Sequence, residues 1–290
     1  MPGIHNGIGT TFRSAAFGGG AAPTFVPFFD TFANGLDGWS LDRLVTGYAA
    51  PILTIVRPSD SATQDIYLDG NSIDTAAILT FVGSENAQVK TIYGQLGYKN
   101  LEQLTLASQP LIAKAGVIIT DGGKPAIEFD GVDDKMVVTA GYSIDLPQMS
   151  ALMVSRSLET GSTPFMSYCL GEGGGRQVYV ESSLYASAGN KSYSYTLTSL
   201  YQDAINNARN LIDIFINGVD AQFGLDGSNV GITKSATPNF TSQLSVGNWV
   251  SGTTYASNIK FQELIMFNNA DRTSERTAMR DNVNSRYTIY

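Results

Sequence analysis

Short runs of apolar residues recur along the chain, separated by Gly, Asp, Asn and Pro. In the run 52–57, Ile52, Thr54 and Val56 alternate with the residues between them, which is typical of a strand with two different faces. Further strands are predicted over 89–93, 116–120, 126–129, 136–139, 150–155, 165–170, 177–180, 192–198, 210–216, 243–246 and 261–267. This spacing predicts a mainly β protein whose strands form a sandwich.

One hairpin and a few short helices complete the predicted elements. Asn217-Gly218 follows an apolar strand and predicts a tight hairpin, because both residues tolerate the positive φ of a type I′ turn. Helices are expected over 40–48, over 75–82 with Asp74 as its cap, and at the C-terminus over 273–285 after Asp271.

Residues 1–30 differ in composition from the rest. They are low in charge and rich in Gly and Ala, and they end in an aromatic cluster of Phe25, Phe28 and Phe29. Such a segment cannot bury enough surface by itself to offset its ordering entropy. It is therefore either a floppy terminus or an extended arm that orders on a neighbouring subunit, with the three Phe as anchors. The sandwich is expected to occupy 31–290.

Composition narrows the chemistry. Charged residues make up 15% of the 290 residues, below the roughly 25% of an ordinary domain, while Gly numbers 30. The net charge of −8 disfavours nucleic acid as a partner, because the phosphates would not be neutralised. A single cysteine, Cys169, and a single histidine, His5, exclude an intramolecular disulfide, a Cys- or His-built metal centre and a Ser-His-Asp triad.

No apolar run reaches the eighteen or so residues that span a bilayer, and the first residues lack the basic and apolar pattern of a secretory signal. We therefore expect a protein that is made in the cytoplasm and does not enter a membrane.

The second half of the chain carries a fold-level likeness. The segment 263–268 before the terminal helix, the Asn217-Gly218 hairpin, and Leu-Ser-Val-Gly at 244–247 together resemble the concanavalin A-like, laminin-G-like jelly roll over about 140–290. That likeness implies a β-sandwich and says little about chemistry.

A more specific likeness lies upstream. Segments 43–48, 55–60 and 64–66 resemble, in order and spacing, the opening of the catalytic domain of B-type α-L-arabinofuranosidases. The same opening, with Phe-Asp-Gly-Val-Asp-Asp at 129–134, is also similar to modules of bacteriophage virion proteins, where it precedes a laminin-G-like sandwich. The sandwich is thus expected to have an arabinofuranosidase-like part, 31–140, and a laminin-G-like part, 141–290.

The enzyme family requires two carboxylates, a nucleophile and an acid/base. Here the likeness places Gln177 at the nucleophile and Asn248 or Trp249 at the acid/base, and none of these can do that work. The family's cysteine pair is also missing, and Gly94 stands where the family has an Asp. Substitute carboxylates would be Glu172 and Glu181, whose ordinary interpretation is surface charge.

Two further groups of residues have alternative interpretations. Asp130, Asp133 and Asp134 could hold calcium, although an Asp-Gly-Val-Asp-Asp run is ordinary turn chemistry, which we favour. Trp249 and Tyr255 could form a sugar-binding platform or cap the core.

Together these observations favour a non-catalytic structural protein of a bacteriophage virion, either a capsid decoration or a tail or fibre component. The expected partners are other virion proteins, further copies of the chain and a host surface glycan, and no cofactor is expected beyond the calcium alternative. A glycoside hydrolase of arabinofuranosidase type is the main alternative. A free-standing lectin is the second.

Overall fold

A computed structural model describes most of the chain. Side chains are described for residues 25–138, 148–158, 208–217, 222–229, 244–248, 256–268 and 270–290. Strand backbone alone is described for 168–170, 177–180, 183–188, 191–196, 220–221 and 230–234.

The first half contains many short strands and a few short helices. Its strands are β1 (Asp37–Ser40), β2 (Leu53–Arg57), β3 (Ala62–Ile66), β4 (Leu68–Asp69), β5 (Ser72–Ile73), β6 (Ala87–Ile92), β7 (Leu101–Glu102), β8 (Leu111–Lys114), β9 (Val117–Ile118), β10 (Thr120–Asp121), β11 (Lys124–Pro125), β12 (Ile127–Asp130) and β13 (Met136–Val138). Its helices are α1 (Phe28–Thr31), α2 (Thr75–Val82) and the 3₁₀ turn η1 (Leu106–Ser108).

The second half contains the longest strands and the terminal helix. Its strands are β14 (Gln148–Ser157), β15 (Tyr168–Leu170), β16 (Gln177–Val180), β17 (Ser183–Ala188), β18 (Lys191–Thr196), β19 (Arg209–Asn217), β20 (Asp220–Leu225), β21 (Ser228–Lys234), β22 (Leu244–Val246) and β23 (Asn258–Asn268). The 3₁₀ turn η2 (Thr273–Glu275) leads into α4 (Arg276–Tyr287).

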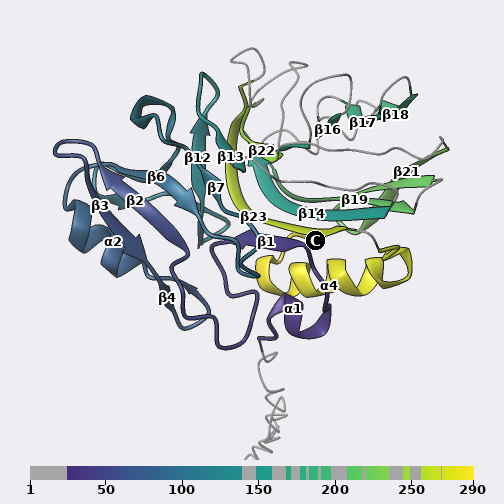
Figure 1. Cartoon of the computed structure of the whole chain (residues 1–290), viewed down its shortest axis with the longest axis horizontal. Helices are drawn as coiled ribbons and strands as arrows, with labels where there is room; N and C mark the ends of the chain where they lie inside the picture. Colours follow the sequence, from purple (N-terminus) through teal and green to yellow (C-terminus); the bar gives the residue numbers. More distant parts are fainter. Residues whose placement is uncertain are drawn as a thin grey trace, which may run out of the picture.

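The described strands pair antiparallel, and most belong to one continuous hydrogen-bonded assembly. At its centre β14 lies between β19 and β23, and β23 in turn pairs with β1 and β12. In Figure 1 these long strands form a curved layer with α4 and α1 beneath it, while α2 covers the β2–β3 region at the other end. The mainly β prediction, with few helices and one at the C-terminus, is confirmed.

The central strands separate two apolar clusters. On β14, Met149, Ala151 and Met153 face the main core, whereas Leu152 and Val154 face the helices. Successive side chains of a strand point to opposite faces, so a strand that is apolar on both faces must be covered on both. This explains why the sequences of β14, β19 and β23 each contain a run of apolar residues that does not alternate with polar ones.

A β-bulge resets this alternation in β23. The register with β14 runs through Val154↔Glu263 and resumes at Ser155↔Phe261, so Gln262 is the extra residue. Its buried side-chain amide donates to carbonyls of β10 and β11, including Asp121 O at 3.1 Å. Beyond the bulge Glu263 points toward α4 instead of the main core.

The aromatic end of the predicted arm lies inside this chain's own fold. Phe28 is fully buried and Phe29 is 8% exposed, and both rings pack against Phe267 with centroids about 6 Å apart. The expectation that Phe28 and Phe29 belong to an extended arm is thereby corrected, because α1 shares an apolar cluster with α4 and β23. Phe25 is partly exposed, and residues 1–24 lie outside the described residues.

Two of the predicted helices form, and one does not. Helix α2 spans 75–82, and the Asp74 carboxylate accepts from Ala77 N at 2.8 Å as a cap. The predicted helix 40–48 is wrong, because its backbone bonds to distant segments: Leu41 N donates to Gln262 O and Arg43 N to Asn71 O. The terminal helix is confirmed, although its first turn is 3₁₀.

β19 and β20 pair as the predicted hairpin, but their register, Ile216↔Ala221, differs from that of a two-residue turn at Asn217-Gly218, which would pair Ile216 with Val219. Residues 218–219 lie outside the described residues. Among the described residues, no helix is long and apolar enough to cross a membrane.

Candidate functional site

Most residues that the sequence singled out for catalysis or sugar binding fall outside the described residues. This holds for Glu172, Glu181, Trp249 and Tyr255. Gln177 begins β16 and pairs with Ser187 of β17, but only its backbone is described. Their roles therefore stay predictions.

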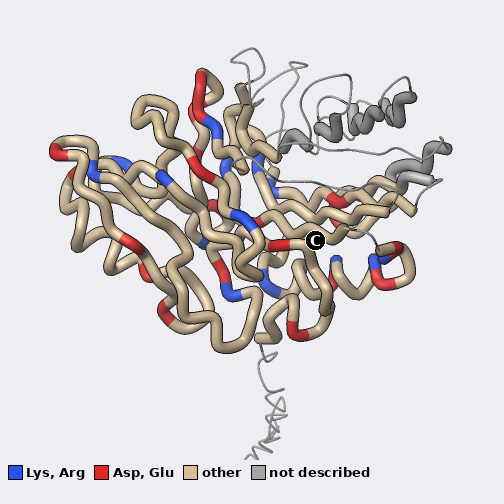
Figure 2. The backbone as a smooth tube through the Cα atoms, viewed as in Figure 1, with Lys and Arg blue, Asp and Glu red and all other residues tan. Residues whose placement is uncertain are grey.

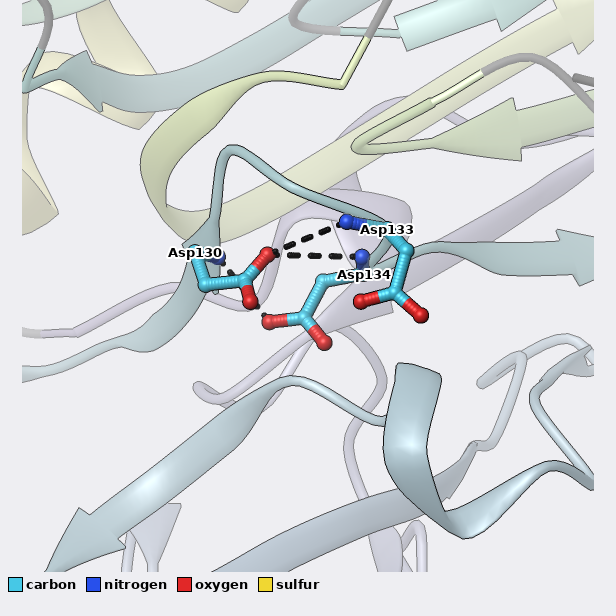
Figure 3. Close-up of side chains that lie close together, drawn as sticks. All are labelled: Asp130, Asp133 and Asp134. Atoms are coloured by element: carbon cyan, nitrogen blue, oxygen red, sulfur yellow. Dashed lines mark hydrogen bonds between the residues drawn. The ribbon is translucent and has the colours of Figure 1, made fainter. Parts of the chain in front are cut away.

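The predicted carboxylate group is brought together after β12. Ligand oxygens of Asp130, Asp133 and Asp134 lie within 4.8 Å of one another (Figure 3). Asp130 Oδ1 accepts from the amides of Val132, Asp133 and Asp134 at 2.8–3.5 Å, and Asp134 Oδ2 accepts from Asp130 N at 2.9 Å. These bonds are those of an Asp-stabilised turn.

The three carboxylates have different environments. Asp130 is exposed, Asp133 accepts from Ser108 Oγ at 2.7 Å, and Asp134 is 5% exposed. Burial raises the pKa of Asp134 to about 7, and the neighbouring Asp130 and Asp133 add to the rise. As they stand, these oxygens hold the turn together through backbone amides.

The turn after β22 contains Asn248, one of the two residues that the sequence likeness places at the acid/base. Gly247 adopts φ +88°, and a Cβ there would lie 2.2 Å from the Phe129 ring. Its carbonyl accepts from Ser257 N at 2.7 Å. Asn248 follows at 1% exposure, so a neutral amide, which cannot act as a general acid, occupies a fixed and buried position.

Several carboxylates are buried with structural partners that the sequence did not reveal. Glu263 accepts from Arg286 with both oxygens, at 2.5 and 2.7 Å, and from Ser40 Oγ at 2.8 Å. Burial alone lowers the pKa of the Arg286 guanidinium, but the Glu263 carboxylate outweighs it, and the pKa is raised. The fully buried pair fastens α4 to β23.

A second buried cluster fastens the start of α4 to β19. Asp213 is fully buried and accepts from Arg276 Nε at 2.6 Å and from Arg280 Nε at 2.7 Å. A Cβ at Gly224 of β20 would lie 1.9 Å from the Arg280 guanidinium, which explains the glycine there.

Asp37 is buried and holds a loop. It accepts from the amides of Leu96, Tyr98 and Lys99 at 2.9–3.0 Å. Burial raises the pKa of its carboxyl, and the backbone hydrogen bonds oppose that rise. A Cβ at Gly94 would lie 2.2 Å from Asp37 Oδ2, so the packing requires glycine at the position where the sequence likeness expects an Asp.

A tyrosine-lined hollow of about 300 Å³ lies between the 48–50 loop and β4. Its walls are Tyr48, Tyr67, Leu68 and two alanines, and Tyr67 is 49% exposed. Burial raises the pKa of Tyr48 to about 12, with smaller contributions from Asp37 and Tyr93. Sequence patterns alone did not indicate this hollow. The one feature of the sequence that could have indicated it is Tyr67, an aromatic residue directly after the strand 62–66.

Charge is distributed without a dominant patch. Figure 2 shows acidic and basic residues interspersed along the described chain.

Comparison with solved structures identifies relatives of the fold. A GH54 α-L-arabinofuranosidase soaked with a cyclic sulfate inhibitor matches with a TM-score of 0.67 and 11% identity, over 89% of this chain and 64% of that chain. A mutant of a GH54 α-L-arabinofuranosidase soaked with 4-nitrophenyl α-L-arabinofuranoside matches with a TM-score of 0.65 and 13% identity, over 89% and 64%. An arabinofuranosidase complexed with arabinofuranosyl-α-1,2-xylobiose matches with a TM-score of 0.62 and 12% identity, over 87% and 62%.

The chain has the β-sandwich fold of these structures. It spans less than two thirds of their length, and the low identity establishes the fold alone. No protein-family model and no curated protein matches the chain.

Proposed function

We propose that this chain is a non-catalytic β-sandwich that serves as a structural component of a bacteriophage virion and contacts host glycans. The observation that carries the non-catalytic part is Asn248. The sequence likeness places this residue at the acid/base of a hydrolase-like fold, and it lies in a buried turn where a Cβ on Gly247 would clash with the Phe129 ring.

The buried carboxylates support the same conclusion. Glu263, Asp213 and Asp37 are held by guanidinium groups or backbone amides, and each lies at 1% exposure or less. A glycoside hydrolase needs one carboxylate to attack the sugar and another to protonate the leaving oxygen. Carboxylates that are buried and saturated with internal hydrogen bonds do not reach a substrate.

The virion role rests on the likeness of the 31–140 segment to virion modules and on the unusual composition of the segment before α1. Because Phe28 and Phe29 belong to the core, the anchoring part is limited to residues 1–27, whose aromatic residues are Phe12, Phe17 and Phe25. Apolar arms bind well in grooves and along sheet edges of a neighbouring subunit.

A turnover assay with 4-nitrophenyl α-L-arabinofuranoside tests the non-catalytic part. We expect no release of nitrophenol from the full chain, and none from the Asn248→Ala control. If the full chain hydrolyses the substrate and the Glu172→Gln or Glu181→Gln variant does not, the chain is a glycoside hydrolase and the non-catalytic proposal is wrong.

Light scattering tests the assembly part, comparing the full chain with a version that starts at residue 26, which removes Phe25 and keeps α1 intact. We expect only the full chain to form oligomers and to join particles. Equal incorporation of both chains would overturn the anchoring role.

A further inference from the structure

The outer face of β2, β3 and β6 carries two hollows in line. Leu53 and Ile55 of β2 point into the main core, so Thr54 and Val56 point outward. Their cross-strand partners on β3 are Asp65 and Thr63. By the same alternation Tyr67, just beyond β3, follows Thr63 and Asp65 on this face.

The tyrosine-lined hollow lies at one end of this row. Tyr67 is 49% exposed, and Tyr48 beside it is half-buried, its hydroxyl donating to Pro51 O at 2.9 Å. Ala49 and Ala50 leave the space in front of the rings open. An exposed aromatic wall with a small-residue floor suits the apolar face of a sugar ring.

The second hollow, of about 210 Å³, lies at the other end, where the 104–109 segment crosses the sheet. It is lined by Val56, Ser61, Thr63, Lys90, Leu104, Leu106 and Gln109. Gln88 of β6 fastens this segment by donating to Leu106 O at 3.0 Å. The hollow combines apolar walls with two hydroxyls, an amide and an ammonium group.

Two of its polar groups lack partners in the part of the chain that the structure describes. The Lys90 ammonium makes no ion pair or hydrogen bond there. Gln109 is 3% exposed, and its Oε1 is buried without a hydrogen-bond donor, although its Nε2 donates to Gln103 O. A buried acceptor without a partner costs free energy unless a ligand satisfies it.

The middle of the row is polar and fixed. Thr54 Oγ1 lies 2.6 Å from Asp65 Oδ1 and 2.9 Å from the Tyr93 hydroxyl. Tyr67 lies four residues after Thr63, which is about 13 Å at the rise of a β-strand. That length exceeds a single sugar ring and suits a short oligosaccharide.

We propose that this face binds an acidic oligosaccharide: Tyr48 and Tyr67 stack on one ring, while Lys90 pairs with a sugar carboxylate whose neighbouring hydroxyl donates to Gln109 Oε1. Ser61 and Thr63 add hydroxyls that can both donate and accept. This face uses none of the residues predicted from sequence for sugar binding, and its occupancy is independent of particle assembly.

Calorimetric titration of the full chain tests the site with trigalacturonic acid and its methyl ester, which keeps the rings and removes the charge. We expect the acid to bind about tenfold more tightly than the ester, as for a charge-assisted hydrogen bond. Lys90→Met should lower the affinity for the acid to that for the ester and leave the ester unchanged. Tyr67→Ala should weaken both ligands, and Tyr67→Phe should weaken neither.

Lys114→Met, which removes an exposed lysine outside the hollow, is the matched charge control and should bind both ligands normally. Equal melting temperatures verify that the variants are folded. The proposal is overturned if the acid does not bind, if the ester binds equally well, or if Lys90→Met binds the acid like the unmodified chain.

Discussion

The guanidinium of Arg286 meets both carboxylate oxygens of Glu263, at 2.5 and 2.7 Å, with the two side chains almost completely buried. The pair joins the last helix to the strand at the centre of the sandwich. Because the pair is buried, removing one partner would leave a charge inside the protein that water cannot hydrate, which is energetically costly.

Removing one partner should therefore destabilise the fold strongly. We expect Glu263→Gln or Arg286→Met to lower the free energy of unfolding by about 3–5 kcal/mol. The double variant Glu263→Leu with Arg286→Met should lose less than either single change, since no charge is left unpaired. Urea denaturation measures all three. Asp60→Asn, in the exposed pair with Arg57, is the control and should have no measurable effect.

The α1 rings are expected to be core residues in solution. Phe28→Ala should cost about 3–5 kcal/mol of unfolding free energy, because it opens a cavity among Phe29, Phe32 and Phe267. Phe25→Ala, at a partly exposed position, should cost much less. Melting temperatures of two truncated chains test the same point. The chain that starts at residue 25 keeps Phe28 and Phe29 and should melt like the full chain, whereas the chain that starts at residue 31 lacks both and should melt at a lower temperature.

Gly94 is expected to resist substitution. Gly94→Ala would place its Cβ 2.2 Å from Asp37 Oδ2 and 2.4 Å from Lys99 O. We expect a loss of about 1–3 kcal/mol, as for other overpacked sites. Gly97→Asn is the control, because that position has φ +76° and open space, and Asn tolerates this conformation. Equal losses for both variants would contradict the packing argument.

Asp134 should make stability depend on pH. Its pKa is raised from 3.8 to about 7 in the folded chain, so between these values the folded state holds a proton that the unfolded state has lost. Stability contributed by this group therefore falls as pH rises through that interval and is level above about 7. Asp134→Asn keeps an acceptor for the backbone amide of Asp130 and should remove this fall.

The measurement is the difference in unfolding free energy between the unmodified chain and the Asp134→Asn variant from pH 4 to pH 8. The difference should move in favour of the variant up to about pH 7. The same samples with added calcium test the metal alternative: if the Asp130 turn is only structural, the melting temperature stays the same. A rise confined to the unmodified chain would assign a metal to the turn.

Elements decided by local interactions were predictable from sequence. Helix α2 was recognisable from Asp74 and the apolar positions after it, and the Asp130 turn from its Asp-Gly run. The 40–48 segment was not, because its backbone partners, Asn71 and Gln262, are set by the tertiary fold. The burial of Phe28 also depends on a residue as distant as Phe267.

The candidate binding face shows the same limit. Tyr67, Lys90 and Gln109 come from separate segments, and only the pairing of β2 with β3 and β6 brings them to one side of a sheet. The direction of Glu263 depended on a bulge at Gln262, which apolar periodicity alone does not reveal.

The pairing of β1 with β23 has a consequence for how the chain folds. Ser40 and Glu263 form a hydrogen bond across 223 residues. The α1 rings pack in one apolar cluster with residues of β23 and α4, so α1 cannot be fully packed until both have been made. A nascent chain therefore cannot close its central layer until residues 258–287 have been synthesised. Such non-local topology slows folding and leaves apolar strand surfaces exposed in the meantime. The final folding step should therefore begin only after residues 258–287 have emerged from the ribosome.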